Sequence, residues 1–383
     1  MWSAQLDFAD FILRGAAELT RETPSLAAAP AVASRLARVL GARLPCQAVI
    51  RWACPVCSTR TVTRWRCGPR CATCRCGAPK SANLLRQIPQ VPVRHWVLSL
   101  PSPQRFDFAG DARSEAAVVK AFMHAVFARL RARDGDRSAG CGAIAAIHRS
   151  GAALNLNLHV HALVVDGVFH RSPDGSRFIV QAPGHEDLAV VAREVQAALA
   201  RLPAADTRDP ALAALQLAAR PRRKLRQATV SSPSGQGSTF ELAGLKVFAG
   251  PPVHADDRAA LRRLCDYVTR PATARFAAAR GNPVTTDPNI ATQPQLGPQE
   301  VVARLVAATP AEPAVSVRTY GVLAPRAAHL WQLGHGHQLE LPSLPCPEPR
   351  RLARARSPRC ARCDVALEAL AVEDASDPPT HHG

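Results

Sequence analysis

Apolar and polar residues alternate along the chain with two different periods. A period of two, typical of β-strands, runs through residues 93–100, 142–148, 154–165 and 240–248. The 3.6-residue period of amphipathic helices runs through residues 114–133, 188–202, 256–270 and 299–308. Strands interleaved with amphipathic helices predict a mixed fold of the α+β or α/β class.

The charge balance changes this picture from a generic mixed fold to one with a polyanionic partner. The chain holds 48 Lys and Arg against 30 Asp and Glu, a formal net charge of +18. Such an excess suits nucleic acid, because neutralised phosphates release counterions. There is no uncharged apolar run of about 18 residues and no secretory signal pattern, so we expect a cytoplasmic protein without membrane contact.

The strand over residues 154–165 carries two histidines on one face. His159 and His161 share the face that also holds Asn155 and Asn157, while the opposite face is apolar. The two imidazoles lie about 6.5–7 Å apart along the strand, so both can lean onto one ion. The alternative is an exposed sheet face on which the histidines are polar filler. No third ligand is identified, because Asp166 points to the opposite face.

The helix over residues 256–270 carries one of the two tyrosines of the chain. Tyr267 lies at the margin of an apolar stripe, so its hydroxyl can face outward. Arg263 and Arg270 lie near it and can neutralise a phosphodiester. The alternative is a boundary tyrosine that packs its ring and exposes its hydroxyl to water. The stripe consists of Leu261, Leu264, Cys265 and Val268.

Clustered cysteines indicate a zinc site near the N-terminus. Two CxxC pairs suit one tetrahedral Zn²⁺, and they predict the ligands Cys54, Cys57, Cys71 and Cys74. Arginines and a tryptophan among them are candidates for phosphate contact and base stacking: Arg64, Trp65 and Arg66. The alternative is a purely structural zinc module with solvated arginines. A further pair, Cys360 and Cys363, has no clear partner pair in the sequence.

Paired histidines, a tyrosine and a basic chain together suit one chemistry. A divalent ion polarises a phosphate in single-stranded DNA, and the tyrosine attacks it to give a 5′-phosphotyrosine. The liberated 3′-hydroxyl can later reverse the reaction without external energy.

Four stretches resemble rolling-circle transposases of the insertion sequence 91 type, in the HUH endonuclease superfamily. They are the cysteine cluster with residues 88–101 (IPQVPVRHWVLSLP), residues 154–169 (LNLNLHVHALVVDGVF), residues 255–271 with LCDYVTRP, and residues 318–326 (RTYGVLAPR). The resemblance implies an α+β fold with a central antiparallel sheet, Mg²⁺ or Mn²⁺ held by His159 and His161, and Tyr267 as nucleophile. Part of the family has a second tyrosine at the position of Arg263, so this chain resembles the single-tyrosine branch. Tyr320 remains an alternative second nucleophile.

This resemblance organises the chain into five parts. They are a helical N-terminal segment (1–45), a Cys-rich zinc-binding module (46–85), an HUH-type catalytic domain (86–275), a divergent C-terminal part of the transposase region (276–340) and a partly disordered Pro/Arg-rich tail with a CxxC (341–383). The implied function is a DNA transposase that nicks and transfers single strands at the ends of a mobile element, in the bacterial cytoplasm near the nucleoid. Two alternatives stay open: a decayed transposase that only binds DNA with zinc, and a metal phosphodiesterase that does not use Tyr267.

Overall fold

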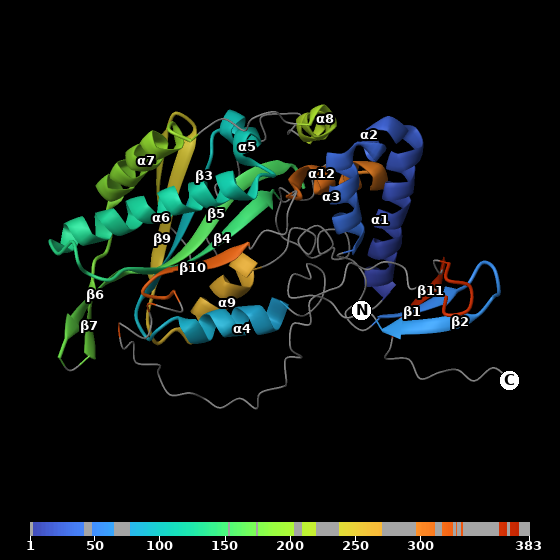
Figure 1. Cartoon of the computed structure of the whole chain (residues 1–383). Coiled ribbons are helices and arrows are strands. Elements are labelled where there is room, and N and C mark those ends of the chain that lie inside the picture. The colour runs from blue at the N-terminus through green and yellow to red at the C-terminus, as the bar shows by residue number, and fades with distance from the viewer. Residues whose placement is uncertain are drawn as a thin grey trace.

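The computed structural model describes most of the chain, and Figure 1 shows the arrangement of its elements. The described residues are 3–41, 48–64, 77–151, 154–173, 175–202, 209–219, 237–269, 296–310, 316–324, 327, 331, 360–365 and 368–374. A central antiparallel sheet is flanked by helices, so the predicted α+β class is confirmed. No helix within these ranges is both long and apolar enough to span a membrane.

Six strands form the central sheet, and every neighbouring pair is antiparallel. Their order across the sheet is β10 (Val317–Gly321), β4 (Gly142–Ser150), β5 (Leu156–Val165), β3 (Val93–Ser99), β9 (Leu245–Val253) and β8 (Ser238–Leu242). The strand with the two histidines, β5, therefore lies inside the sheet. Part of this sheet comes from residues 317–321, outside the range 86–275 that the sequence assigns to the catalytic domain.

One face of the sheet is covered by α6 (Ala112–Asp134) and α7 (His185–Leu199) (Figure 1). The apolar face of β5 lies in this core, as the alternation predicts, with Leu158, Val160 and Ala162 fully buried. The helix α6 begins at Asp111, whose carboxylate accepts the backbone N–H of Ser114 at 2.8 Å, and it ends at the left-handed Gly135. A short helix, α5 (Ser102–Phe108), precedes it.

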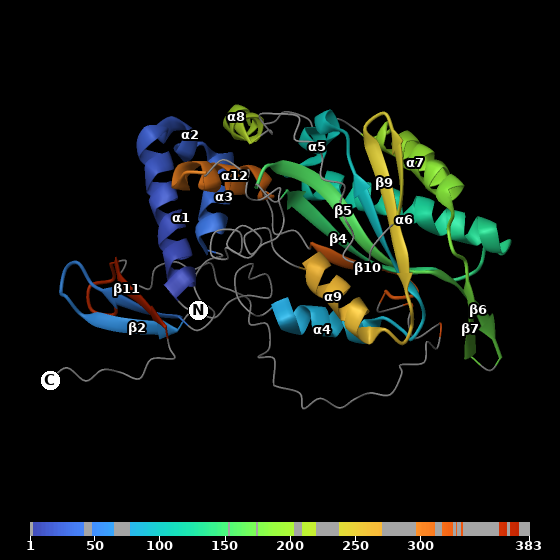
Figure 2. The same ribbon diagram turned by 180° about the vertical axis from the view of Figure 1, so that it is seen from behind.

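The other face of the sheet is covered by α4 (Gly77–Gln87) and α9 (Arg258–Thr269), which lie against each other (Figure 2). Leu163 and Val165 of β5 join this second core, together with the predicted apolar stripe of α9. Asp257 begins α9, since its carboxylate accepts the N–H of Ala260 at 2.8 Å. The two faces of β5 thus pack into two different cores, one beneath α6 and α7 and the other beneath α4 and α9.

A helical bundle stands beside one end of the sheet (Figures 1 and 2). It contains α1 (Ser3–Glu22), α2 (Pro24–Ala28), α3 (Pro30–Gly41), α8 (Pro210–Ala218) and α12 (Pro298–Ala308). Its core also takes Leu156, at the start of β5, and Leu154, two residues before it. A Cβ on Gly15 would lie 2.1 Å from Pro298 O, so the lack of a side chain there permits the close packing of α1 on α12.

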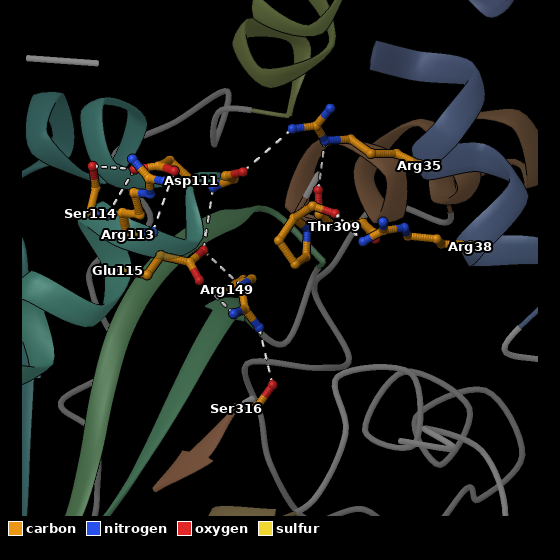
Figure 3. A network of polar contacts seen from close by, with 11 residues as sticks. Arg35, Arg38, Asp111, Arg113, Ser114, Glu115, Arg149, Thr309 and Ser316 are labelled. Atoms are coloured by element: carbon orange, nitrogen blue, oxygen red, sulfur yellow. Dashed lines mark hydrogen bonds and ion pairs between the residues drawn. The ribbon is translucent and has the colours of Figure 1, made fainter. Parts of the chain in front are cut away.

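Polar contacts connect this bundle to the sheet and α6 (Figure 3). Arg35 of α3 donates to the carbonyl of Thr309 at 2.8 Å and to that of Gly110 at 3.4 Å. Glu115 of α6, which is fully buried, pairs with Arg149 of β4 at 2.8 Å. The helical N-terminal segment is therefore joined to the sheet-containing part of the chain.

A smaller sheet combines two segments that lie far apart in the chain. Its order is β11 (Glu368–Asp374), β1 (Ala48–Ala53) and β2 (Arg60–Arg64). The segment expected to be a Pro/Arg-rich tail thus contributes a strand to the Cys-rich module, while residues 332–359 and 375–383 lie outside the described residues. A separate hairpin joins β6 (Gly167–Ser172) and β7 (Gly175–Val180).

The expected single strand over residues 240–248 is instead the hairpin of β8 and β9. Its turn is Ala243–Gly244, with φ of 48° and 82°. Two consecutive residues with positive φ give the tight turn that matches the twist of paired strands. An alanine gives no local signal for such a turn, so the alternation appears unbroken in the sequence.

Candidate metal and tyrosine site

Three histidines meet on the face of the sheet beneath α9. His148 of β4 lies directly opposite His159 of β5, and His161 follows on the same face of β5. Each ring offers one nitrogen atom, and these three nitrogens lie within 4.8 Å of one another. The three side chains are buried, with His161 fully enclosed. The structure thus brings the predicted pair together with a third imidazole that the sequence analysis did not identify.

Hydrogen bonds to carbonyl groups fix the tautomers of two of these rings. His148 Nε2 lies 2.9 Å from Val268 O, and His159 Nδ1 lies 2.7 Å from Asn157 O. A carbonyl oxygen can only accept, so each of these nitrogens carries the proton. His148 Nδ1 and His159 Nε2 then hold the lone pairs that a metal ion requires.

The third ring is oriented by another histidine that the sequence analysis missed. His95 Nε2 of β3 lies 3.0 Å from His161 Nδ1, and the two rings are stacked with centroids 5.2 Å apart. Burial lowers the pKa of His95 to about 4, so this ring is neutral and its Nε2 can accept the His161 proton. In that tautomer His161 Nε2 holds the lone pair, so each of the three rings has one nitrogen that can bind a metal ion.

Tyr267 lies beside these histidines. Its ring stands edge-on to His161, with centroids 5.3 Å apart, and edge-on to His95 at 6.0 Å. The neighbours of Tyr267 on α9, Leu264 and Val268, are buried and fix the helix to the sheet, whereas Tyr267 itself is half-buried. Because Val268 O accepts the His148 proton, α9 is also bonded directly to the histidine cluster.

The other tyrosine lies on the opposite side of the sheet. Tyr320 of β10 pairs with Ala143 and packs against the core beneath α6 and α7. Burial raises the pKa of Tyr320. The structure therefore does not bring Tyr320 to the histidine cluster. Asp166 also points away from this cluster, as predicted, since it forms a buried ion pair with Arg94 at 2.8 Å.

The expected DNA-contact residues are described only in part. Arg263 is exposed on α9, one helical turn before Tyr267, and lines an open hollow of about 310 Å³ with residues of β9. Arg64 ends β2, and its side chain lies outside the described part of the structure. Trp65, Arg66 and Arg270 also lie outside it.

Two of the four predicted zinc ligands, Cys54 and Cys57, lie in the described part of the chain. Cys54 and Cys57 face Cys360 and Cys363, and the four sulfurs lie within 4.8 Å of one another. The C-terminal CxxC, which has no clear partner pair in the sequence, therefore lies beside the first CxxC. Cys71 and Cys74, the expected second pair, lie outside the described residues. Four cysteines of this kind could hold a zinc ion.

The histidine cluster also fits a metal ion by its donor chemistry. Imidazole nitrogens bind first-row transition ions, whereas Mg²⁺ prefers oxygen ligands in an octahedral set. Of the two expected ions, Mn²⁺ suits three imidazoles better than Mg²⁺. The ligand atoms would be His148 Nδ1, His159 Nε2 and His161 Nε2.

Comparison with known proteins finds a similarity for part of the chain. No curated protein and no solved structure matches the chain. A family model described as "Putative transposase" matches residues 142–329. This range contains the three clustered histidines and Tyr267, and the match supports a transposase.

Proposed function

We propose that this protein is a metal-dependent transposase that nicks single-stranded DNA at the ends of a mobile element and transfers the strand. The observation that carries the proposal is the position of Tyr267, whose ring lies 5.3 Å from that of His161 in a three-histidine cluster. A tyrosine beside a metal-binding cluster, in a segment related to transposases, suits covalent phosphoryl transfer.

In this mechanism the Tyr267 hydroxyl oxygen attacks the scissile phosphorus. The bond from Tyr267 Oη to phosphorus forms as the bond from phosphorus to the 3′-oxygen breaks. The phenol proton leaves to solvent, and the 3′-oxygen takes up a proton to become a hydroxyl group. The new phosphotyrosine keeps the free energy of the original phosphodiester. A 3′-hydroxyl of another strand can therefore reverse the step and join to the retained 5′ end.

The side chains around Tyr267 have separate tasks. His148, His159 and His161 would hold a divalent ion, Mn²⁺ in preference to Mg²⁺, which when bound supplies a positive charge that polarises the phosphate. His95 orients His161 through its ring nitrogen. Arg263, exposed one turn away, is placed to bind a neighbouring phosphate of the DNA strand. The net charge of +18 also attracts the negatively charged backbone of DNA to the protein as a whole.

A covalent trapping assay tests the proposal. Purified full-length protein is incubated with Mn²⁺ and labelled single-stranded oligonucleotides that tile the DNA on both sides of its gene. We expect a protein–DNA band that survives a denaturing gel. Tyr267→Phe and His159→Ala should abolish the band. Tyr320→Phe is the matched control, because it removes the other tyrosine of the chain from the far face of the sheet and should retain the band.

Each of the remaining outcomes of this assay would indicate a different function. Cleavage without a covalent band, undiminished in Tyr267→Phe, would indicate a phosphodiesterase in which a water molecule is the nucleophile. Retardation of DNA on a native gel with neither cleavage nor a covalent band would indicate a remnant that only binds DNA. A band that persists in Tyr267→Phe and disappears in Tyr320→Phe would assign the reaction to the other tyrosine.

A further inference from the structure

The two CxxC segments beside the small sheet share one pattern of backbone hydrogen bonds, although Cys57 and Cys360 are 303 positions apart in the chain. In the first, Cys54 N–H donates to Thr59 O at 2.9 Å, and Ser58 N–H donates to Cys54 O at 2.9 Å. In the second, Cys360 N–H donates to Val365 O at 2.8 Å, and Asp364 N–H donates to Cys360 O at 2.8 Å. The fifth residue of each turn is left-handed, with φ of 55° at Ser58 and 52° at Asp364.

This repeated turn presents both sulfurs of a pair to the same point. Cys57 N–H donates to Cys54 Sγ over 3.5 Å within the first turn. The leading cysteine of each pair is buried, with 2% of Cys54 and 4% of Cys360 exposed. The two segments therefore form matching halves of one site.

The spacing between the halves fits a metal ion and not a disulfide. Cys57 Sγ and Cys360 Sγ lie 3.6 Å apart. A tetrahedral zinc site with Zn–S bonds of about 2.3 Å has sulfurs about 3.8 Å apart, whereas a disulfide needs about 2.05 Å. The remaining described cysteines, Cys141 and Cys265, lie apart from this site, each in an apolar core on one face of the central sheet.

The strand pairing explains how distant segments reach one point. β1 pairs with β11 in antiparallel register, from Ala48 opposite Asp374 to Ala53 opposite Glu368. Cys54 directly follows the end of β1, and Cys363 precedes the start of β11 by a few residues, so both turns lie at the same end of the strand pair. The described apolar cluster here contains little besides the four cysteines and Val365. Such a small core gives little stability without a metal ion.

We propose that Cys54, Cys57, Cys360 and Cys363 bind a single structural Zn²⁺ that joins the two ends of the chain into one module. Four thiolates complete the coordination of zinc, so the site is closed and has no position for a substrate. The C-terminal strand β11 then depends on the metal ion for its attachment to β1. Cys71 and Cys74 are not ligands of this ion.

Paired substitutions in the full-length protein distinguish this ligand set from the sequence-based one. The double variant Cys360→Ser/Cys363→Ser should lose one bound zinc per chain. The matched variant Cys71→Ser/Cys74→Ser removes the same number of thiols and should keep the zinc content of the wild type. Replacement of zinc by Co²⁺ separates this site from the histidine cluster, since only cysteine ligands give thiolate-to-cobalt charge-transfer absorption. That absorption should persist in the second variant and disappear in the first.

Amide hydrogen exchange on the wild-type protein covers the case in which a variant fails to fold. Addition of a zinc chelator should increase exchange over residues 368–374, which form β11, and leave residues 93–99 of the central sheet protected. Loss of the absorption in the Cys71/Cys74 variant and its retention in the Cys360/Cys363 variant would overturn the proposal. Iron in place of zinc in the purified protein, or unchanged exchange at β11 after chelation, would also overturn it.

Discussion

When His161 donates from Nδ1 to His95 Nε2, its own Nε2 is the nitrogen that can bind a metal ion. The His161 Nδ1 proton needs an acceptor, and His95 Nε2 lies 3.0 Å from it in a fully buried position. Loss of the partner that orients a metal ligand costs about 10- to 100-fold in metal affinity. We therefore expect His95→Phe to weaken Mn²⁺ binding by this factor, measured by calorimetric titration of the folded variant.

A conservative variant distinguishes orientation from simple packing. In His95→Gln the amide oxygen can still accept the His161 proton, so Mn²⁺ affinity should return to within about threefold of wild type. If His95→Phe and His95→Gln bind Mn²⁺ equally well, the contact between His95 and His161 has no role in metal binding.

Sequence alternation could predict His159, His161 and Tyr267, because each lies within a long, regular apolar pattern. His148 could not be found in this way, since its place opposite His159 depends on the pairing register of β4 and β5. The only local signal was that His148 shares a face of its strand with Ile144 and Ala146. His95 was hidden for the same reason, in a strand that is buried on both faces.

At the scale of elements, one carboxylate connects two helices on the far side of the sheet. Asp187 accepts the Gly184 N–H at 2.6 Å at the start of α7, and it pairs with Arg129 and Arg133 of α6. Burial alone would raise the pKa of Asp187, but the Gly184 amide and the two guanidiniums outweigh it, so the pKa lies below the ordinary value of 3.8. The charged form is thus favoured in the folded protein.

This shift predicts a pH-dependent loss of stability in one variant. We expect Asp187→Asn to lower the free energy of unfolding by about 1–3 kcal/mol at pH 7. A carboxyl group whose pKa is lowered by folding stabilises the folded protein at pH values above its ordinary pKa. This stabilisation is lost as the pH falls through the pKa of the folded state. The difference between wild type and variant in urea unfolding should therefore shrink below about pH 4.

Glu186→Gln is the matched control for this prediction, because it removes the neighbouring, exposed carboxylate. It should change the free energy of unfolding by less than about 0.5 kcal/mol. An equal effect of both variants, or a constant Asp187→Asn effect down to pH 3, would show that the contacts of Asp187 do not stabilise the fold.

Helices with a long apolar stripe could be predicted from the sequence. Short strands, and strands that depend on a distant partner strand, could not. The helices α6, α7 and α9 carry continuous apolar stripes and lie within a few residues of their predicted positions. β1 and β2 flank the first CxxC and are too short for a pattern to stand out. β11 depends on a partner strand more than 300 positions away, which no local sequence feature indicates.

At the scale of the whole molecule, the three larger cores meet along β5. Leu158 and Val160 lie in the core beneath α6, and Leu163 lies in the core beneath α9. Leu156, at the start of β5, and Leu154, two residues before it, lie in the core of the helical bundle. The bundle also uses α12, which comes from the far end of the chain. The sequence gives amphipathic helices at both ends, but it does not indicate that they pack on each other and on this strand.

Because the bundle shares β5 with the histidine site, we expect the two to unfold together. Ile12 of α1 is fully buried in the bundle core, while the adjacent Leu13 is 57% exposed. Ile12→Ala should lower the free energy of unfolding by about 2–5 kcal/mol, and Leu13→Ala should change it by less than about 0.5 kcal/mol. In Ile12→Ala, helix content by circular dichroism and Mn²⁺ binding should be lost in one transition at lower urea concentration. If helix content falls first while Mn²⁺ binding keeps the wild-type midpoint, the N-terminal helices form a separate folding unit, and their contacts with Leu154 and Leu156 contribute nothing to the site.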